Sequence, residues 1–146
     1  MAEVRPTKAY FGGTFDLVHL GHIRIFERAK KKYGRVVVAV NTDQYVRDFK
    51  GKYPLYSLEE RMEFLRSIRH VDEVVMNLGG KNCIPSILNS GATHIVAGSD
   101  WRPREKYLES LGLTEDRLQD FGLEIVFEDS GFAFHGFDIK KRIRES

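Results

Sequence analysis

The chain has 146 residues, of which 42% are hydrophobic and 30% are charged, and this composition is typical of a globular protein with a single core. Its 23 basic and 21 acidic side chains leave a net charge of +2, so charge gives no support for a nucleic-acid partner or an anionic membrane. The single cysteine, Cys83, excludes an internal disulfide and a cysteine-based zinc site.

The sequence holds no repeat and no low-complexity segment, so we expect residues 1–146 to form one domain. No apolar run is long enough to cross a bilayer, and residues 1–6 hold no apolar signal core. We therefore expect a cytoplasmic protein without a membrane partner.

The first predicted elements are a strand, a helix and a second strand. Residues 9–11 are apolar and predict a short strand, and residues 20–33 have the spacing of an amphipathic helix that Gly34 ends. Residues 36–40 are apolar without alternation and largely β-branched, which favours a parallel strand buried on both faces. A helix of this length between two parallel strands implies a right-handed crossover.

The middle of the chain predicts two helices joined by a loop. Residues 44–49 predict a short helix, and residues 50–56 are rich in turn formers and lysine. Ser57 and Glu60 have the spacing of a capping box, which predicts that the second helix begins there. The apolar face of that helix carries Leu58, Met62, Leu65 and Ile68.

The remainder of the chain continues the alternation of strands and helices. Three more strands are predicted at residues 71–76, 94–97 and 123–127. Helices are predicted at residues 84–90, 104–111, 115–120 and 138–144. The alternation predicts an α/β fold with a doubly wound parallel five-stranded sheet, whose ligands bind beyond the carboxyl ends of the strands.

The stretch from Gly12 to His22 joins the first strand to the first helix and has the sequence GGTFDLVHLGH. Two glycines at the strand exit allow a sharp turn and a close approach of a ligand to the backbone. His19 and His22 are three residues apart and share one face of the first helical turn, where free N–H groups and the helix dipole favour a phosphate. The alternative is an ordinary turn with two surface histidines. The pattern is neither GxGxxG nor GxxxxGK[ST], so it favours neither a dinucleotide site nor a P-loop.

Thr14-Phe15-Asp16, followed by His19, Gly21 and His22, resembles the TFDxxHxGH signature of the cytidylyltransferase-like nucleotidyltransferases. The likeness runs from Tyr10 to about Trp101 and is strongest to the glycerol-3-phosphate cytidylyltransferases. The heptose-1-phosphate adenylyltransferases share much of the same pattern. The resemblance implies a Rossmann-like sheet.

The implied reaction is the transfer of CMP from CTP to a phosphorylated alcohol, with release of pyrophosphate. The alternatives are an adenylyltransferase that uses ATP and a sugar phosphate, and a nucleotide-binding protein without turnover. The reaction also implies a Mg²⁺ ion that is held mainly by the nucleotide with few protein ligands, and no residue is assigned as a dedicated metal ligand. Because residues 69–74 resemble a segment near the dimer contact of these enzymes, we expect a homodimer.

The resemblance assigns five catalytic residues: His19, His22, Lys50, Lys52 and Arg61. The histidines would donate hydrogen bonds to phosphate oxygens, the lysines would contact the acceptor phosphate or the α-phosphate, and Arg61 would clamp a phosphate. The alternative for the lysines is a solvated loop, and for Arg61 a surface ion pair with Glu60 or Glu63.

The nucleotide-binding set comprises Gly12, Gly13, Thr14, Phe15, Asp16, Gly21, Gly98, Asp100, Trp101 and His135. Within it, Asp16 would orient the turn or help to place a metal, and Asp100 would bind the ribose hydroxyls or the metal. Trp101 would pack on the nucleotide or in the core. His70 and His94 are expected to be structural.

The family pattern breaks after the fifth predicted strand, where these enzymes carry a segment like RTEGISTT. Residues 128–137 read EDSGFAFHGF instead, without the arginine and the Ser-Thr-Thr run. Ser130, His135 and Gly136 are the nearest substitutes. One hypothesis is that the three phenylalanines line a pocket for an acceptor less polar than glycerol phosphate. The other is that triphosphate binding is weakened and catalysis lost. The first is favoured because the histidines, the lysines and Asp100 are present.

Overall fold

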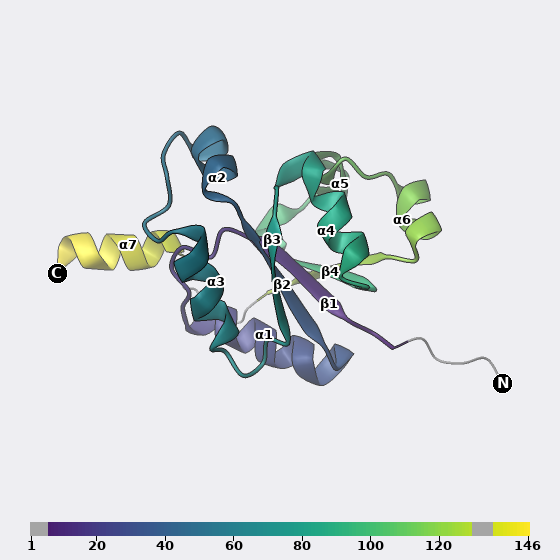
Figure 1. Cartoon of the computed structure of the whole chain (residues 1–146), viewed down its shortest axis with the longest axis horizontal. Helices are drawn as coiled ribbons and strands as arrows, with labels where there is room; N and C mark the ends of the chain where they lie inside the picture. The colour runs from purple at the N-terminus through teal and green to yellow at the C-terminus, as the bar shows by residue number, and fades with distance from the viewer. Residues whose placement is uncertain (1–5, 130–135) are drawn as a thin grey trace.

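The computed structural model describes residues 6–129 and 136–146, which form one α/β unit (Figure 1). Its strands are β1 (Ala9–Gly13), β2 (Val36–Asn41), β3 (Glu73–Asn77), β4 (His94–Gly98) and β5 (Glu124–Glu128). Its α-helices are α1 (Leu20–Tyr33), α2 (Asp43–Lys50), α3 (Leu58–Arg66), α4 (Ile84–Asn89), α5 (Arg104–Leu111), α6 (Glu115–Phe121) and α7 (Gly136–Glu145). Two short 3₁₀ helices, η1 (Gly80–Cys83) and η2 (Ser99–Trp101), complete the described elements.

The five strands form one sheet in the order β3-β2-β1-β4-β5, and every neighbouring pair is parallel. This confirms the predicted doubly wound parallel sheet. The strand order reverses between β2 and β4, on either side of β1, and such a reversal opens a crevice at the carboxyl ends of the strands. The turns that follow β1 and β4 therefore meet at one edge of the sheet, as the sequence predicts.

Strand β2 is buried on both faces because alternate side chains enter two separate cores. Val36, Val38 and Val40 pack with α1 and α3 in one core, whereas Val37 and Ala39 face the other core beneath α4 and α5. Figure 1 shows α1 and α3 on one side of the sheet and α4 and α5 on the other. The absence of polar alternation in β2 is thus explained by helices on both faces.

The predicted helix boundaries hold where capping groups mark them. Helix α1 has the predicted bounds, and Gly34, whose φ is +86°, caps its carboxyl end. At the start of α3 the Glu60 N–H donates to the Ser57 hydroxyl and the Ser57 N–H donates to the Glu60 carboxylate, which confirms the capping box. Helix α3 ends at Arg66, so Ile68 lies beyond the helix, although it still packs against the core. No helix in the described ranges is long and apolar enough to cross a membrane.

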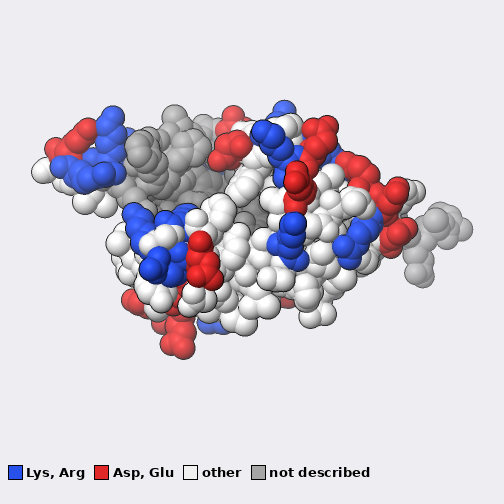
Figure 2. All heavy atoms as spheres, turned by 90° about the horizontal axis from the view of Figure 1, so that it is seen from above, with Lys and Arg blue, Asp and Glu red and all other residues white. Residues whose placement is uncertain are grey.

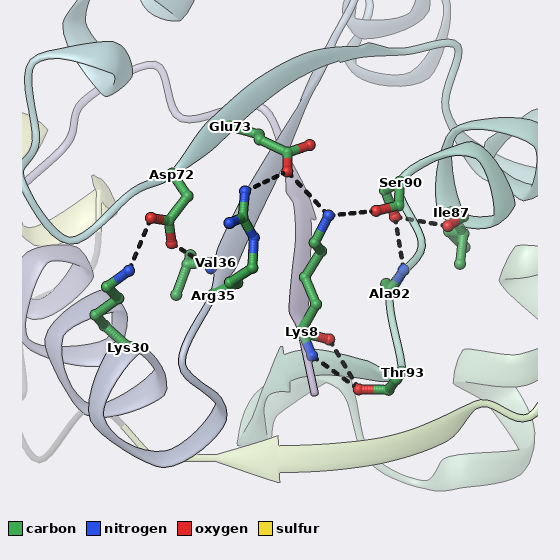
Figure 3. Close-up of polar contacts among 10 residues, drawn as sticks. All are labelled: Lys8, Lys30, Arg35, Val36, Asp72, Glu73, Ile87, Ser90, Ala92 and Thr93. Carbon is green, nitrogen blue, oxygen red and sulfur yellow. Dashed lines mark hydrogen bonds and ion pairs between the residues drawn. The ribbon is translucent and has the colours of Figure 1, made fainter. Parts of the chain in front are cut away.

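A network of ion pairs ties the amino-terminal ends of the strands together (Figure 3). The Lys8 ammonium donates to Glu73 at 2.9 Å and to the Ser90 carbonyl at 2.6 Å, and Arg35 donates to the same Glu73 oxygen at 3.1 Å. Beside it, Asp72 accepts from Lys30 at 2.7 Å and from the Val36 N–H at 2.8 Å.

The carboxyl groups of this network should make the stability of the fold depend on pH in the acid range. The hydrogen bond from Lys8, assisted by Arg35 and opposed by partial burial, holds the pKa of Glu73 below its usual value. For Asp72, partial burial is outweighed by the hydrogen bonds from Lys30 and the Val36 N–H, so its pKa is also lowered. The unfolded state then binds more protons, so this stabilisation is present at neutral pH and is lost as pH falls through the lowered pKa values.

We therefore expect the urea midpoint of the wild type to fall as the pH is lowered below about 4, where free carboxyl groups protonate. The double variant Asp72→Asn, Glu73→Gln should have a lower urea midpoint at neutral pH, and its midpoint should fall less steeply as the pH is lowered. Urea unfolding at a series of pH values measures both curves. Parallel curves for the two proteins would contradict this account.

Candidate active site

The turn between β1 and α1 is held in a strained conformation by aromatic packing. Phe15 has a φ of +52°, which is unfavourable for a bulky residue. Its ring lies 5.6 Å from the His22 ring and 6.0 Å from the Phe26 ring, measured between centroids. A Cβ at Gly13 would come within 3.0 Å of the Phe15 ring, so a side chain there would press on the packed ring. Strain of this kind clusters at ligand sites.

The two histidines cap α1 with their own side chains. The Gly21 N–H donates to Nδ1 of His19 at 3.0 Å, and the His19 N–H donates to Nδ1 of His22 at 3.2 Å. Because each Nδ1 accepts, the neutral imidazole of each residue carries its proton on Nε2. The centroids of the two rings lie 4.1 Å apart at the amino-terminal end of the helix. This arrangement provides two imidazole N–H donors beside a helix dipole that attracts anions.

Asp16 ties the β1–α1 turn to the loop before α3. Its two carboxylate oxygens accept the N–H groups of Leu55 at 2.9 Å and Tyr56 at 3.0 Å. Of the two roles expected for Asp16, orienting the turn therefore has direct contacts. Within the described residues no group of three or more His, Cys, Asp or Glu side chains could hold a metal ion.

Arg61 lies inside the protein, with a side-chain exposure of 1%. Its Nη1 donates to the carbonyls of Thr14 at 2.7 Å and Asn41 at 2.8 Å, and its Nε donates to the Tyr56 carbonyl at 3.0 Å. Its Nη2 donates to Asp43 at 2.6 Å. The alternative of a surface ion pair with Glu60 or Glu63 is wrong, because the guanidinium is buried and its ion pair is with Asp43.

Lys50 and Lys52 lie at the surface, at the end of α2 and in the loop that follows it. Lys50 is the last residue of α2, and Gly51 ends that helix with a φ of +79°. Figure 2, in which the molecule is seen from above, shows Lys and Arg side chains gathered over α2 and the loop that follows it. The exposed basic residues of this segment are Arg47, Lys50 and Lys52. The contact of both lysines with a phosphate stays a prediction.

The turn after β4 carries the other candidate residues. Asp100 and Trp101 belong to η2 and are exposed, Trp101 by 49%. The Trp101 ring lies 5.5 Å from the Tyr107 ring, so it covers the edge of the core rather than filling it. A Cβ at Gly98 would lie 2.6 Å from a carboxylate oxygen of Asp100, so a side chain there would displace this exposed carboxylate. His135 and Ser130 lie outside the described residues.

Residues 10–112 match the family model described as cytidylyltransferase-like, which is more than half of the chain. The chain belongs to this family. An FAD synthase of Pyrococcus abyssi is 35% identical over 117 residues, 77% of this chain and 79% of that protein. A glycerol-3-phosphate cytidylyltransferase of Bacillus subtilis is 37% identical over 97 residues, 66% of this chain and 74% of that protein. The bifunctional protein HldE of Coxiella burnetii is 48% identical over 64 residues, 43% of this chain and 14% of its own length.

A solved structure shares the fold of this cytidylyltransferase-like chain. The lipopolysaccharide core biosynthesis protein of Thermoplasma volcanium superposes with a TM-score of 0.66 at 23% identity, covering 83% of this chain and 93% of that one. The resemblance stated from the TFDxxHxGH residues is thus confirmed, as is the Rossmann-like fold. The enzyme class, a nucleotidyltransferase, is shown by the family and its named relatives.

The cytidylyltransferase-like chain also has a cavity on the α3 side of the β1–α1 turn. Its volume is about 440 Å³, and it is lined on one side by residues of the turn, from Phe15 to Val18. The opposite wall comes from Tyr56 and from α3, where the exposed Phe64 ring and Glu63 contribute. The cavity therefore adjoins the turn for which the sequence predicts phosphate binding.

Three polar residues near the turn were absent from the predicted site. Asp43 pairs with Arg61, and the Asn41 amide donates to the Thr14 hydroxyl at 3.2 Å. The Asn77 amide donates in turn to the Asn41 side-chain oxygen at 3.0 Å. A signal was present in the sequence, because each residue stands at or just after the carboxyl end of a predicted strand, where the ligands of such sheets bind.

Proposed function

We propose that this chain transfers a nucleotidyl group from a nucleoside triphosphate to a phosphate monoester and releases pyrophosphate. The observation that carries the proposal is the pair of imidazole Nε2–H donors of His19 and His22 at the start of α1. An acceptor phosphate oxygen would attack the α-phosphorus as the bond to the β-phosphate oxygen breaks. Negative charge on the α-phosphate oxygens would be met by the two N–H donors and by the helix dipole.

The other site residues fit supporting roles in this reaction. Lys50 and Lys52 lie on the segment after β2 and would bring positive charge to the acceptor phosphate. Asp100 and Trp101, on the turn after β4, would contact the nucleoside. The Mg²⁺ ion would be held mainly by the phosphates of the nucleotide.

The first pair of substrates to test is CTP and a phosphorylated alcohol such as glycerol 3-phosphate. The support is the relative named glycerol-3-phosphate cytidylyltransferase, which aligns with 66% of the chain. A second pair is ATP and flavin mononucleotide. It is favoured by the longer alignment with the FAD synthase and by the aromatic rings of Phe15, Tyr56 and Phe64 around the cavity, which suit a flat ring system better than glycerol does.

The test is release of pyrophosphate with Mg²⁺, each of the four ribonucleoside triphosphates, and a panel of acceptors that includes glycerol 3-phosphate, heptose 1-phosphate and flavin mononucleotide. We expect turnover with one nucleotide and one acceptor. CTP with an alcohol phosphate would support the first pair, and ATP with flavin mononucleotide the second. Nucleotide binding without pyrophosphate release from any pair would contradict the proposal and favour a binding protein. Sedimentation of the same protein tests the proposed homodimer.

A further inference from the structure

A chain of hydrogen bonds crosses three adjacent strands at the edge where the candidate site lies. It begins at the buried Gly79 N–H, which donates to the side-chain oxygen of Asn77 at 3.0 Å. The Asn77 amide nitrogen donates to the Asn41 oxygen at 3.0 Å, and the Asn41 amide nitrogen donates to the Thr14 hydroxyl at 3.2 Å. These side chains are neighbours across the sheet because Asn41 and Asn77 are register partners at the ends of β2 and β3, and Thr14 directly follows β1.

The direction of every bond in this chain is fixed by the Gly79 backbone. A peptide N–H can only donate, so the Asn77 group that faces it has to be the oxygen. The Asn77 NH₂ group then faces Asn41 and requires its oxygen, which turns the Asn41 NH₂ group toward Thr14. The Thr14 hydroxyl therefore accepts from Asn41, and its own hydrogen has to point to a different acceptor.

We infer that Asn77 is a positioning residue for the transfer reaction: acting through Asn41, it directs the Thr14 hydroxyl hydrogen toward a phosphate oxygen of the bound nucleotide. The inference rests on the proposed function, which places a phosphate at this turn. Phosphate oxygens only accept hydrogen bonds, so a hydroxyl held as a donor suits them, whereas a hydroxyl that donated to Asn41 would present lone pairs to an anion.

The surroundings hold the chain in this single arrangement. Asn77 is 5% exposed, so water does not compete for its amide. Gly79 has a φ of +84°, and a Cβ there would lie 2.4 Å from the Tyr45 ring, so the donor that starts the chain is fixed by glycine under an aromatic ring. The carbonyl of Thr14 is held separately by Arg61 at 2.7 Å. The backbone and the hydroxyl of Thr14 are thus positioned by different groups.

The test is a double-variant cycle between Asn77 and Thr14. Asn77→Asp still accepts from Gly79 but cannot donate to Asn41, so the Asn41 amide is free to reverse and take the Thr14 hydrogen. Asn77→Leu removes the same donor without adding charge. Each is combined with Thr14→Val, which lacks the hydroxyl, and with Thr14→Ser, which keeps it. The readouts are the Kd of the magnesium complex of each triphosphate by calorimetry, kcat/KM for the active pair, and urea unfolding.

We expect Thr14→Val and each Asn77 variant alone to weaken nucleotide binding about tenfold, as for a lost hydrogen bond to a charged group. In the Thr14→Val background the Asn77 substitutions should change Kd by less than about twofold, whereas in Thr14→Ser the tenfold loss should remain. A loss from Asn77 that persists in Thr14→Val would overturn the inference, because a structural or purely charge effect does not need the hydroxyl. A wild type that binds no triphosphate would overturn the proposed function and this inference with it.

Discussion

Replacing His19 with alanine is expected to lower kcat for pyrophosphate release by about a hundredfold or more. The Nε2–H of His19 lies at the start of α1, where it would donate to the α-phosphate as charge builds in the transition state. Removal of a donor that acts on developing charge lowers kcat as well as kcat/KM. Steady-state assays with the active substrate pair measure both values for the variant and the wild type.

His19 has a second task that the experiment must separate from the first. Its Nδ1 accepts the Gly21 N–H and so caps the helix, and loss of such a cap costs about 1 kcal/mol of the free energy of unfolding. The matched variant is His19→Asn, since asparagine is a good helix cap but lacks the imidazole N–H. We expect both variants to lose activity and only His19→Ala to lose stability. Near-normal turnover in His19→Asn would contradict the assignment of His19.

A histidine remote from the site provides the control. His94 begins β4, at the opposite end of the sheet, where it contacts the Thr93 hydroxyl at 2.7 Å and lies 3.1 Å from Glu124. His94→Gln should leave kcat within about twofold of the wild type, because no contact of His94 reaches the β1–α1 turn. A hundredfold loss in this variant would indicate that damage to the fold, and not loss of a donor, explains the effect at His19.

The sequence predicts well those parts of the site that local contacts decide. The two histidines lie on one face of the first turn of α1 because residues three apart on a helix are neighbours, whatever the rest of the chain does. The capping box of α3 and the glycine end of α1 are local for the same reason. The strand order brings the turns after β1 and β4 together, and the alternation of strands and helices was enough to expect it.

The roles of Asp16 and Arg61 could not be predicted in this way, because their contacts are distant in sequence. Asp16 accepts from amides 39 and 40 residues later, and Arg61 donates to a carbonyl 47 residues earlier. Glu60 and Glu63 lie near Arg61 in the sequence and offered a surface ion pair as the alternative to a phosphate clamp. A clue against it was present: Arg61 is three residues from Leu58 and four from Leu65, so it lies on the inward face of α3.

The burial of Arg61 predicts that its substitution destabilises the whole fold. Arg61→Met would remove the donors to the carbonyls of Thr14, Asn41 and Tyr56 and leave Asp43 without its cation. Loss of one partner from a buried, hydrogen-bonded ion pair typically costs about 3–5 kcal/mol, and we expect a fall in the free energy of unfolding near the lower end of that range. The reason for the lower end is that the Asp43 side chain is 40% exposed and can be solvated.

Urea unfolding measures this loss, and Arg66→Met is the matched control. Arg66 is on the same helix and exposed, so its substitution should change the free energy of unfolding by about 0.5 kcal/mol or less. Arg61→Lys keeps the charge but not the planar fork that reaches four oxygens, so it should restore only a small part of the stability. A stability of Arg61→Met equal to that of Arg66→Met would contradict the structural role.

The same variants separate a positioning role for Arg61 from the phosphate clamp expected from the family resemblance. A clamp that contacts the substrate would lose turnover in Arg61→Lys while stability stayed near the wild-type value. In the structure the guanidinium instead holds the Thr14 carbonyl, and with it the turn that carries both histidines. Activity and stability should therefore fall together in Arg61→Lys, with a higher KM for the nucleotide under conditions where the variant remains folded. Loss of kcat alone, with an unchanged free energy of unfolding, would instead support the role of Arg61 as a phosphate clamp.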